Sequence, residues 1–126
     1  MPADTSKPRI FIVENHEDTL RYLVKFLESQ GCEVRTAHNV ADALEKMAEW
    51  DPEVLISDLG LPDGNGWELM TKLRARGCHP HAIAMSGFGM YSDIQRSRQA
   101  GFSHHLTKPF MPEDLLQVMV HGFARG

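Results

Sequence analysis

The sequence predicts an α/β fold in which a doubly wound parallel sheet is covered by helices on both faces. Five short apolar runs, each too short for a helix, alternate with five segments whose apolar residues recur at helical spacing. This alternation is typical of repeated βα units, which place their strands in a parallel sheet. Because the crossovers between parallel strands are right-handed, the connecting helices fall on both faces of that sheet.

The predicted strands are runs rich in β-branched, aliphatic and aromatic residues, and they lie at 10–13, 32–37, 54–58, 82–85 and 104–106. Each is followed by a segment with helical spacing of apolar residues, at 20–27, 40–47, 67–74, 91–100 and 112–120. Gly31 stands where a glycine commonly follows a helix end, and Asn39 offers an N-cap to the second helix. Asp51-Pro52 is expected to break that helix, and Pro112 suits the first position of the last one.

Length and composition indicate one globular domain. The chain has 126 residues, of which 42% are hydrophobic and 24% charged, and a chain of this size buries roughly two thirds of its surface on folding. We expect residues 1–8, with two prolines, to form a flexible leader and residues 9–126 to form the domain. Membrane insertion is not expected, because no apolar run approaches the ~20 residues of a membrane helix and no secretory signal is visible.

Charge, cysteines and histidines limit the partners and the compartment. A formal charge of −4 without a basic stripe argues against direct binding of nucleic acid. Cys32 and Cys78 lack metal-ligand spacing and are interpreted as reduced structural thiols of a cytoplasmic protein. His104 and His105 are neighbours on one predicted strand and therefore point to opposite faces, and no cysteine or carboxylate completes a zinc set with them. His16 is interpreted as a solvated loop residue.

Polar side chains follow four of the predicted strands at their carboxyl ends: Glu14 and Asn15, then Asp58, Ser86 and Lys108. In doubly wound sheets, ligands bind beyond these strand ends. Two carboxylates, an amide, a hydroxyl and an ammonium at one edge match the needs of phosphoryl transfer. They supply oxygen ligands for a hard divalent cation and donors for phosphoryl oxygens.

This arrangement resembles the receiver domain of two-component response regulators. The resemblance covers the chain from about Arg9 onward and rests on the segments IFIVEN (10–15), VLISDLGLPDGNG (54–66), AIAMSG (82–87) and LTKPF (106–110). It implies a flavodoxin-like (βα)5 fold whose five parallel strands have the order 2-1-3-4-5, as in a chemotaxis member of this family. It also implies a cis peptide bond between Lys108 and Pro109.

The resemblance implies roles in phosphoryl transfer for four residues. Asp58 would be the phosphoacceptor, which takes its phosphoryl group from a sensor histidine kinase or a His-phosphotransfer domain. Ser86 would bond the phosphoryl group and Lys108 would pair with it, so that the domain catalyses its own phosphorylation and dephosphorylation. His105 occupies the aromatic switch position and would move with Ser86. Phosphorylation would then shift the shape of a face formed by the helix at 91–100, the fifth strand and the last helix, toward a downstream partner that the sequence does not identify.

The resemblance also implies a Mg²⁺ site. Glu14 and Asn15 fall on the acidic pair of the family, Asp58 adds its carboxylate, and Gly60 adds its backbone carbonyl. Because Asn15 replaces an acid, we expect Mg²⁺ to bind more weakly than at a full acidic pair. Gly60 and Phe88 also occupy positions that tune hydrolysis in the family: Gly60 leaves room for an attacking water, whereas Phe88 shields the site.

The same residues bear on three other possible functions. Asn15 favours a pseudo-receiver that binds proteins without phosphorylation, but the presence of Asp58, Ser86 and Lys108 argues against it. A small hydrolase with an aspartyl-phosphate intermediate needs a substrate pocket, and 126 residues leave no cap domain to build one. Neither GxGxxG nor GxxxxGK[ST] follows the first strand, which argues against a nucleotide or flavin binder.

We expect no effector domain after Gly126, and therefore either a single-domain regulator or the receiver of a hybrid sensor kinase. The segments SGFGM and GFSHHLTKPF are similar to receivers of hybrid kinases. The expected location is the cytoplasm, or the cytoplasmic part of a larger membrane-bound sensor kinase.

Overall fold

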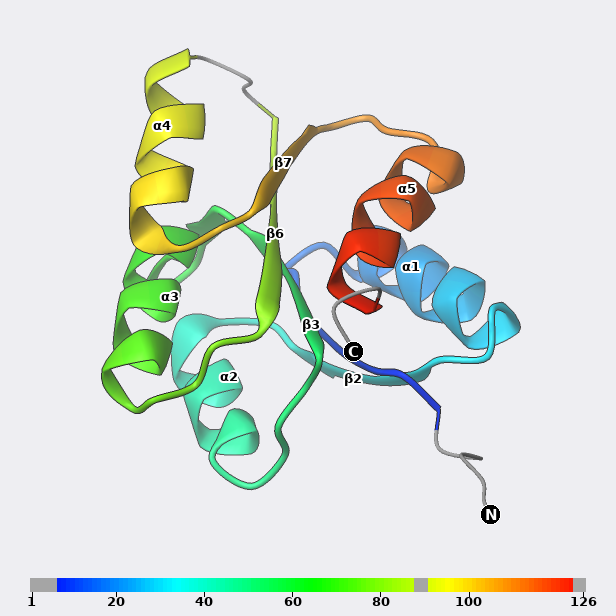
Figure 1. Ribbon diagram of the computed structural model, residues 1–126, viewed down its shortest axis with the longest axis horizontal. Helices are drawn as coiled ribbons and strands as arrows, with labels where there is room; N and C mark the ends of the chain where they lie inside the picture. Colours follow the sequence, from blue (N-terminus) through cyan, green and yellow to red (C-terminus); the bar gives the residue numbers. More distant parts are fainter. Residues whose placement is uncertain (1–6, 88–90, 124–126) are drawn as a thin grey trace.

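A central sheet of five parallel strands carries helices on both faces (Figure 1). The computed structural model describes residues 7–87 and 91–123. The strands of this sheet are β1 (Arg9–Val13), β2 (Glu33–Ala37), β3 (Val54–Asp58), β6 (His81–Ser86) and β7 (His104–Thr107). The helices are α1 (Glu17–Ser29), α2 (Val40–Met47), α3 (Gly66–Ala75), α4 (Tyr91–Ala100) and α5 (Pro112–Phe123). Phe88 and residues 1–6 of the expected leader lie outside the described residues.

The strand order is β2-β1-β3-β6-β7, and all four neighbouring pairs are parallel. Counted along the chain, this is the order 2-1-3-4-5, so the predicted flavodoxin-like (βα)5 fold is confirmed. The register pairs Val13 with Ser57 and Asp58 with Met85. The carboxyl ends of β1, β3 and β6 are therefore level, and the residues that follow them meet at one edge.

Alternation along the strands builds two cores, one on each face of the sheet. Phe11 and Val13 point to the face that is covered by α2 and α3, whereas Ile10 and Ile12 point to the face covered by α1 and α5 (Figure 1). All four side chains are fully buried, as expected of strands covered on both faces. In the described part of the chain, no helix is long and apolar enough to cross a membrane.

The predicted helix ends are largely confirmed. Gly31 has a φ of +87°, the left-handed conformation that glycine adopts at little cost, and its N–H donates to the Glu28 carbonyl at 3.0 Å. The Asn39 side chain caps α2 by accepting from the Asp42 N–H at 2.8 Å. α5 begins at Pro112, as predicted.

The predicted helix over 40–47 is confirmed, but α2 ends at Met47 with Ala48 as its C-cap, several residues before Asp51-Pro52, so that pair does not break it. The segment after Asp58, expected as a loop, contains a short antiparallel hairpin of β4 (Gly60–Leu61) and β5 (Gly64–Asn65). Two-residue strands are too short to produce a periodic pattern, so this pair could not be predicted from apolar spacing.

The Asp63 carboxylate, at the turn of this hairpin, attaches the hairpin to the start of α2. Its two oxygens accept from the backbone N–H groups of Val40 and Ala41 at 2.8 and 3.0 Å, at the start of α2. A carboxylate is well placed at a helix N-terminus, where the first N–H groups have no partner within the helix. The hairpin after Asp58 is therefore held at its turn by the contact of Asp63 with α2, and after β5 the chain continues directly into α3.

We expect Gly66→Ala to destabilise the protein, because a Cβ there would lie 2.9 Å from both the Asp58 carbonyl oxygen and Leu59 Cδ2. Relief of this clash requires a backbone shift beside Asp58, which costs about 1–3 kcal/mol of the free energy of unfolding. Gly60→Ala is the matched control, because its Cβ would meet nothing within 4 Å. Urea unfolding of both variants measures the difference, and equal stabilities would contradict the close packing at Gly66.

Candidate functional site

One ammonium bridges two buried carboxylates at the edge where the strands end. Lys108 Nζ lies 2.7 Å from Glu14 Oε1 and 2.9 Å from Asp58 Oδ2. Glu14 is 0% exposed and Asp58 is 7% exposed, so both charges are held largely out of water. The strand ends bring these residues together from positions 14, 58 and 108 of the chain, as the sequence predicts.

The segment after β7 sets the position of the Lys108 side chain. The Lys108 N–H donates to the Ser86 carbonyl at 2.7 Å, which extends the pairing of β6 and β7 by one bond. The peptide bond between Lys108 and Pro109 is cis, as the resemblance implied. The backbone of Lys108 is thereby attached to the strand that ends in Ser86.

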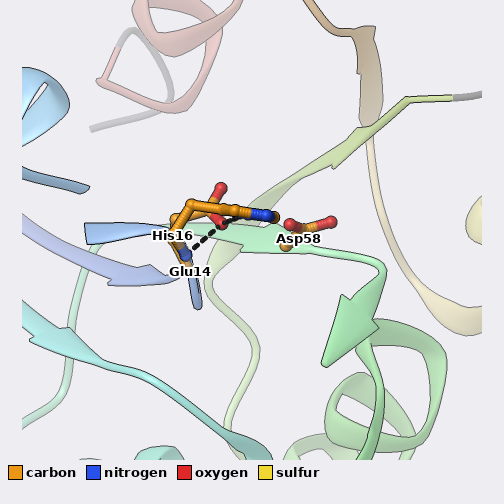
Figure 2. Close-up of side chains that lie close together, drawn as sticks. All are labelled: Glu14, His16 and Asp58. Atoms are coloured by element: carbon orange, nitrogen blue, oxygen red, sulfur yellow. Dashed lines mark hydrogen bonds and ion pairs between the residues drawn. The ribbon is translucent and has the colours of Figure 1, made fainter. Parts of the chain in front are cut away.

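Each carboxylate has a second partner on its other oxygen. Glu14 Oε2 accepts from the His16 backbone N–H at 3.0 Å and lies 3.1 Å from His16 Nδ1 (Figure 2). The His16 side chain is 72% exposed, so the predicted solvated ring is confirmed, but it also contacts the site. Asp58 Oδ1 accepts from the Gly60 N–H at 3.2 Å.

The two carboxyl groups differ in their acidity. Burial raises the pKa of Asp58, and the nearby charge of Glu14 adds to it, so that the Lys108 ammonium and the Gly60 N–H do not restore the ordinary value. Burial opposes ionisation of Glu14 too, but Lys108 and the two His16 contacts outweigh it and hold its pKa below the usual range. Burial tends to lower the pKa of Lys108, yet its two carboxylate partners raise it, so the ammonium form is secured.

The acidic edge has the donor atoms of a cation site. One ligand atom each of Glu14, His16 and Asp58 lie within 4.8 Å of one another (Figure 2). Asn15 is exposed on the loop after β1, and Gly60 follows Asp58 by two residues. Two carboxylates with neighbouring amide and carbonyl oxygens fit a hard divalent cation, which prefers oxygen ligands.

A hydrogen-bonded chain leads from this edge into the helical layer. Ser86 Oγ lies 2.8 Å from His105 Nε2, and His105 Nδ1 lies 3.4 Å from Ser97 Oγ on α4. The Trp67 indole N–H of α3 donates to the same Ser97 oxygen at 2.9 Å. On the opposite face of β7, the His104 ring meets the His81 ring at 5.2 Å, as the alternation of the strand predicts.

Sequence reasoning found Ser86 and His105 but missed Ser97 and Trp67. The signal for Ser97 lies in the weak apolar pattern of α4, where Gln95, Arg96 and Arg98 are exposed and Ser97 is buried. A buried hydroxyl on a polar helix requires a partner, but the sequence cannot say which one.

Comparisons with known proteins agree with this geometry. The family model of the response regulator receiver domain matches residues 10–120. An uncharacterized 14.6 kDa protein of Leptolyngbya boryana is 32% identical over 87% of this chain and 86% of its own length. The transcriptional regulatory protein PrrA of Mycobacterium leprae is 30% identical over 92% of this chain. A CheY-like receiver domain protein from Methanospirillum hungatei has 27% identity and a TM-score of 0.88 over 96% of this chain and 100% of its own.

The chain therefore belongs to the response regulator receiver domain family. It is a receiver of two-component signalling, as the sequence predicted, and members of this family receive phosphate from histidine kinases and generally bind Mg²⁺ at their acidic site. The chain spans 50% of the length of PrrA, which carries further sequence outside the matched part.

The raised pKa of Asp58 predicts how the stability of the metal-free protein depends on pH. Its value in the folded protein lies above the ordinary 3.8, so the folded carboxyl is protonated before the unfolded one as the pH falls. The ionised carboxyl lowers stability at neutral pH, and this penalty disappears in acid. In EDTA, Asp58→Asn should therefore gain stability relative to the wild type at neutral pH, by a margin that shrinks as the pH falls.

Asp63→Asn is the control with the opposite sign. The N–H groups of Ala41 and Val40 hold the pKa of Asp63 below its ordinary value, so its ionised form contributes stability that is present at neutral pH and lost in acid. Urea unfolding at several pH values compares the two variants. The same pH trend in both would contradict the assignment of opposite shifts.

Proposed function

We propose that Asp58 accepts a phosphoryl group from a phosphohistidine of a sensor kinase or a His-phosphotransfer domain. The observation that carries this proposal is the Lys108 ammonium, which lies 2.9 Å from Asp58 Oδ2 at the edge of the sheet. A cation beside a carboxylate nucleophile offsets the negative charge that the transferring phosphoryl group brings. The family identity supports the same step.

In this step, a carboxylate oxygen of Asp58 attacks the phosphorus. The bond from Asp58 to phosphorus forms as the phosphorus–nitrogen bond to the donor histidine breaks, and the electron pair of that bond returns to the imidazole. Because burial and Glu14 raise the pKa of Asp58, its ionised form is a stronger base and a better nucleophile than a solvated aspartate. Lys108 and the Ser86 hydroxyl are the groups proposed to contact the phosphoryl oxygens.

The residues present fit a bound Mg²⁺ ion. Glu14 and Asp58 would hold it with their carboxylates, Gly60 with its backbone carbonyl, and Asn15 directly or through water. When bound, the ion supplies positive charge against the phosphoryl oxygens. Lys108 then keeps a separate role, because its ammonium still donates hydrogen bonds at a site where Glu14 and Asp58 would also hold the metal.

We propose that His105 transmits the conformational change caused by phosphorylation to α4. This side chain contacts Ser86 on one side and α4 on the other, so movement of Ser86 toward a phosphoryl group changes what α4 packs against. Phosphorylation then favours one conformer of the face formed by α4, β7 and α5. A downstream protein partner would recognise this face, and relatives such as PrrA, named as a transcriptional regulator, suggest that the response concerns gene expression.

Incubation with acetyl phosphate and Mg²⁺, followed by measurement of the intact mass, tests the proposed acceptor. We expect one phosphoryl group on the wild type, none on Asp58→Asn, and one on Asp63→Asn, which changes an exposed aspartate of the same loop. A phosphoryl group on Asp58→Asn would contradict the assignment. A folded wild type that stays unmodified would favour the pseudo-receiver alternative.

Replacement of Asn15 by aspartate should tighten Mg²⁺ binding. The added carboxylate restores one attracting charge beside Glu14, and we expect the dissociation constant to fall by about tenfold. Calorimetric titration measures this change, with Gln30→Glu as the charge-matched control at the far end of α1. Equal tightening in both variants would show that only net charge matters, and no tightening in Asn15→Asp would remove Asn15 from the site.

A further inference from the structure

We propose that His16 completes a three-ligand site with Glu14 and Asp58, and that its imidazole favours a borderline divalent ion such as Zn²⁺ over Mg²⁺. The group consists of a carboxylate directly after β1, an imidazole from the same loop, and the carboxylate that ends β3 (Figure 2). Within residues 7–87 and 91–123, it is the one group of three histidine, cysteine, aspartate or glutamate residues placed to hold a metal ion. The inference rests on the acidic site of the proposed function, but not on transfer of the phosphoryl group.

The His16 side chain is turned toward the acids and not toward the helix that it precedes. His16 is the N-cap residue of α1, yet its side chain makes no capping hydrogen bond. Residues favoured at an N-cap are serine, threonine, aspartate and asparagine, whose side-chain oxygens accept from the first N–H groups of the helix. The His16 backbone N–H and ring Nδ1 instead both contact Glu14 Oε2, at 3.0 and 3.1 Å. These two contacts hold the exposed ring at the site before any ion binds.

The separations within the group suit ligands of a single ion. Zinc binds imidazole nitrogen and carboxylate oxygen at about 2.0–2.2 Å, so two adjacent ligands of one ion lie about 3.0–3.4 Å apart. The 3.1 Å between His16 Nδ1 and Glu14 Oε2 falls in this range. One ligand atom of each of the three residues lies within 4.8 Å of the other two, so a small movement of the exposed ring closes the group around one ion.

The Lys108 ammonium leaves one oxygen of each acid for such an ion. It contacts Glu14 Oε1 and Asp58 Oδ2, whereas Glu14 Oε2 is the oxygen that contacts His16. Asp58 Oδ1 accepts from the Gly60 N–H at 3.2 Å, and a carboxylate oxygen has a second lone pair. The two acids can therefore bind a cation without loss of their contacts with Lys108.

Charge and ligand type together decide which ion the site favours. The two acids and Lys108 leave one net negative charge, and Asn15 adds none. Mg²⁺ is a hard ion that is held through oxygen ligands, so a missing carboxylate weakens its binding most. Imidazole nitrogen suits Zn²⁺ and other borderline ions, so His16 adds to the affinity for Zn²⁺ and adds little to that for Mg²⁺. The two ions then compete for the same two acids.

Calorimetric titrations with Zn²⁺ and with Mg²⁺ test the third ligand, at pH about 7.5 where an ordinary histidine is mostly neutral. His16→Gln removes the imidazole of an exposed residue and keeps a neutral side chain of similar size. We expect its Zn²⁺ dissociation constant to rise at least about tenfold, because even residues that only orient a metal's ligands cost 10–100-fold in affinity when replaced. Its Mg²⁺ dissociation constant should be unchanged. His38→Gln is the matched control and should change neither constant, because His38 Nε2 lies 2.6 Å from Glu17 Oε1 in a histidine–carboxylate pair without a third ligand.

Nitrogen NMR shows whether the ring itself binds the ion. Zn²⁺ should shift the Nδ1 signal of His16, which is assigned by its loss in His16→Gln, and leave the ring signals of His38 unchanged. Mg²⁺ above its own dissociation constant should weaken the apparent binding of Zn²⁺, because both ions need Glu14 and Asp58. A Zn²⁺ affinity that is the same in His16→Gln, a His16 signal that Zn²⁺ does not move, or an absence of competition would each overturn the proposal.

The outcomes also distinguish this inference from the proposed function, because the acetyl phosphate experiment uses Mg²⁺ alone. If Asp58 is phosphorylated and His16→Gln binds Zn²⁺ as the wild type does, the third ligand is wrong and the acceptor stands. If Zn²⁺ binds through His16 and Asp58 takes no phosphoryl group, the metal site stands and the pseudo-receiver alternative is favoured.

Discussion

The ion pair of Lys108 with Glu14 and Asp58 is the constraint on which the rest of the site depends. Two buried carboxylates are costly to bring together, since each loses its hydration and repels the other. Lys108 Nζ contacts both, at 2.7 and 2.9 Å, and leaves the three groups with one net negative charge. The register of this fold makes the ends of β1, β3 and β7 level, and this places the three side chains at one edge. The parallel sheet thus positions the site as well as building the core.

The same ammonium serves two acids whose surroundings differ. Glu14 also accepts from the N–H of His16 and contacts its ring, and its pKa lies below the usual range. Asp58 has fewer donors and feels the charge of Glu14, and its pKa is raised. The surroundings therefore favour the ionised form of Glu14 and disfavour the ionised form of Asp58. Bonding to phosphorus or to a cation relieves a carboxylate whose charge is costly, so this asymmetry fits the proposed role of Asp58 as phosphoacceptor and, with Glu14, as a ligand of the proposed metal site.

Much of this arrangement could be predicted from the sequence. Apolar periodicity located the five strands and five helices, and the polar residues at strand ends gave Glu14, Asp58, Ser86 and Lys108. The contacts that were missed join residues by tertiary structure alone. Trp67 and Ser97 lie 30 positions apart on different helices, and no periodic pattern relates them. The contact of the His16 ring with Glu14 depends on the turn after β1, whose conformation the residue types do not determine.

The central claim is that a phosphoryl group on Asp58 is sensed through Ser86 and His105 by the helical layer. Amide proton–nitrogen spectra with Mg²⁺, before and after addition of beryllofluoride as a phosphoryl mimic, test it most directly. The account predicts that the mimic binds the wild type but not Asp58→Asn, and that the amide signals of Ser86, His105 and Ser97 shift together. Binding that leaves Ser97 and the rest of α4 unchanged, or binding that persists in Asp58→Asn, would contradict it.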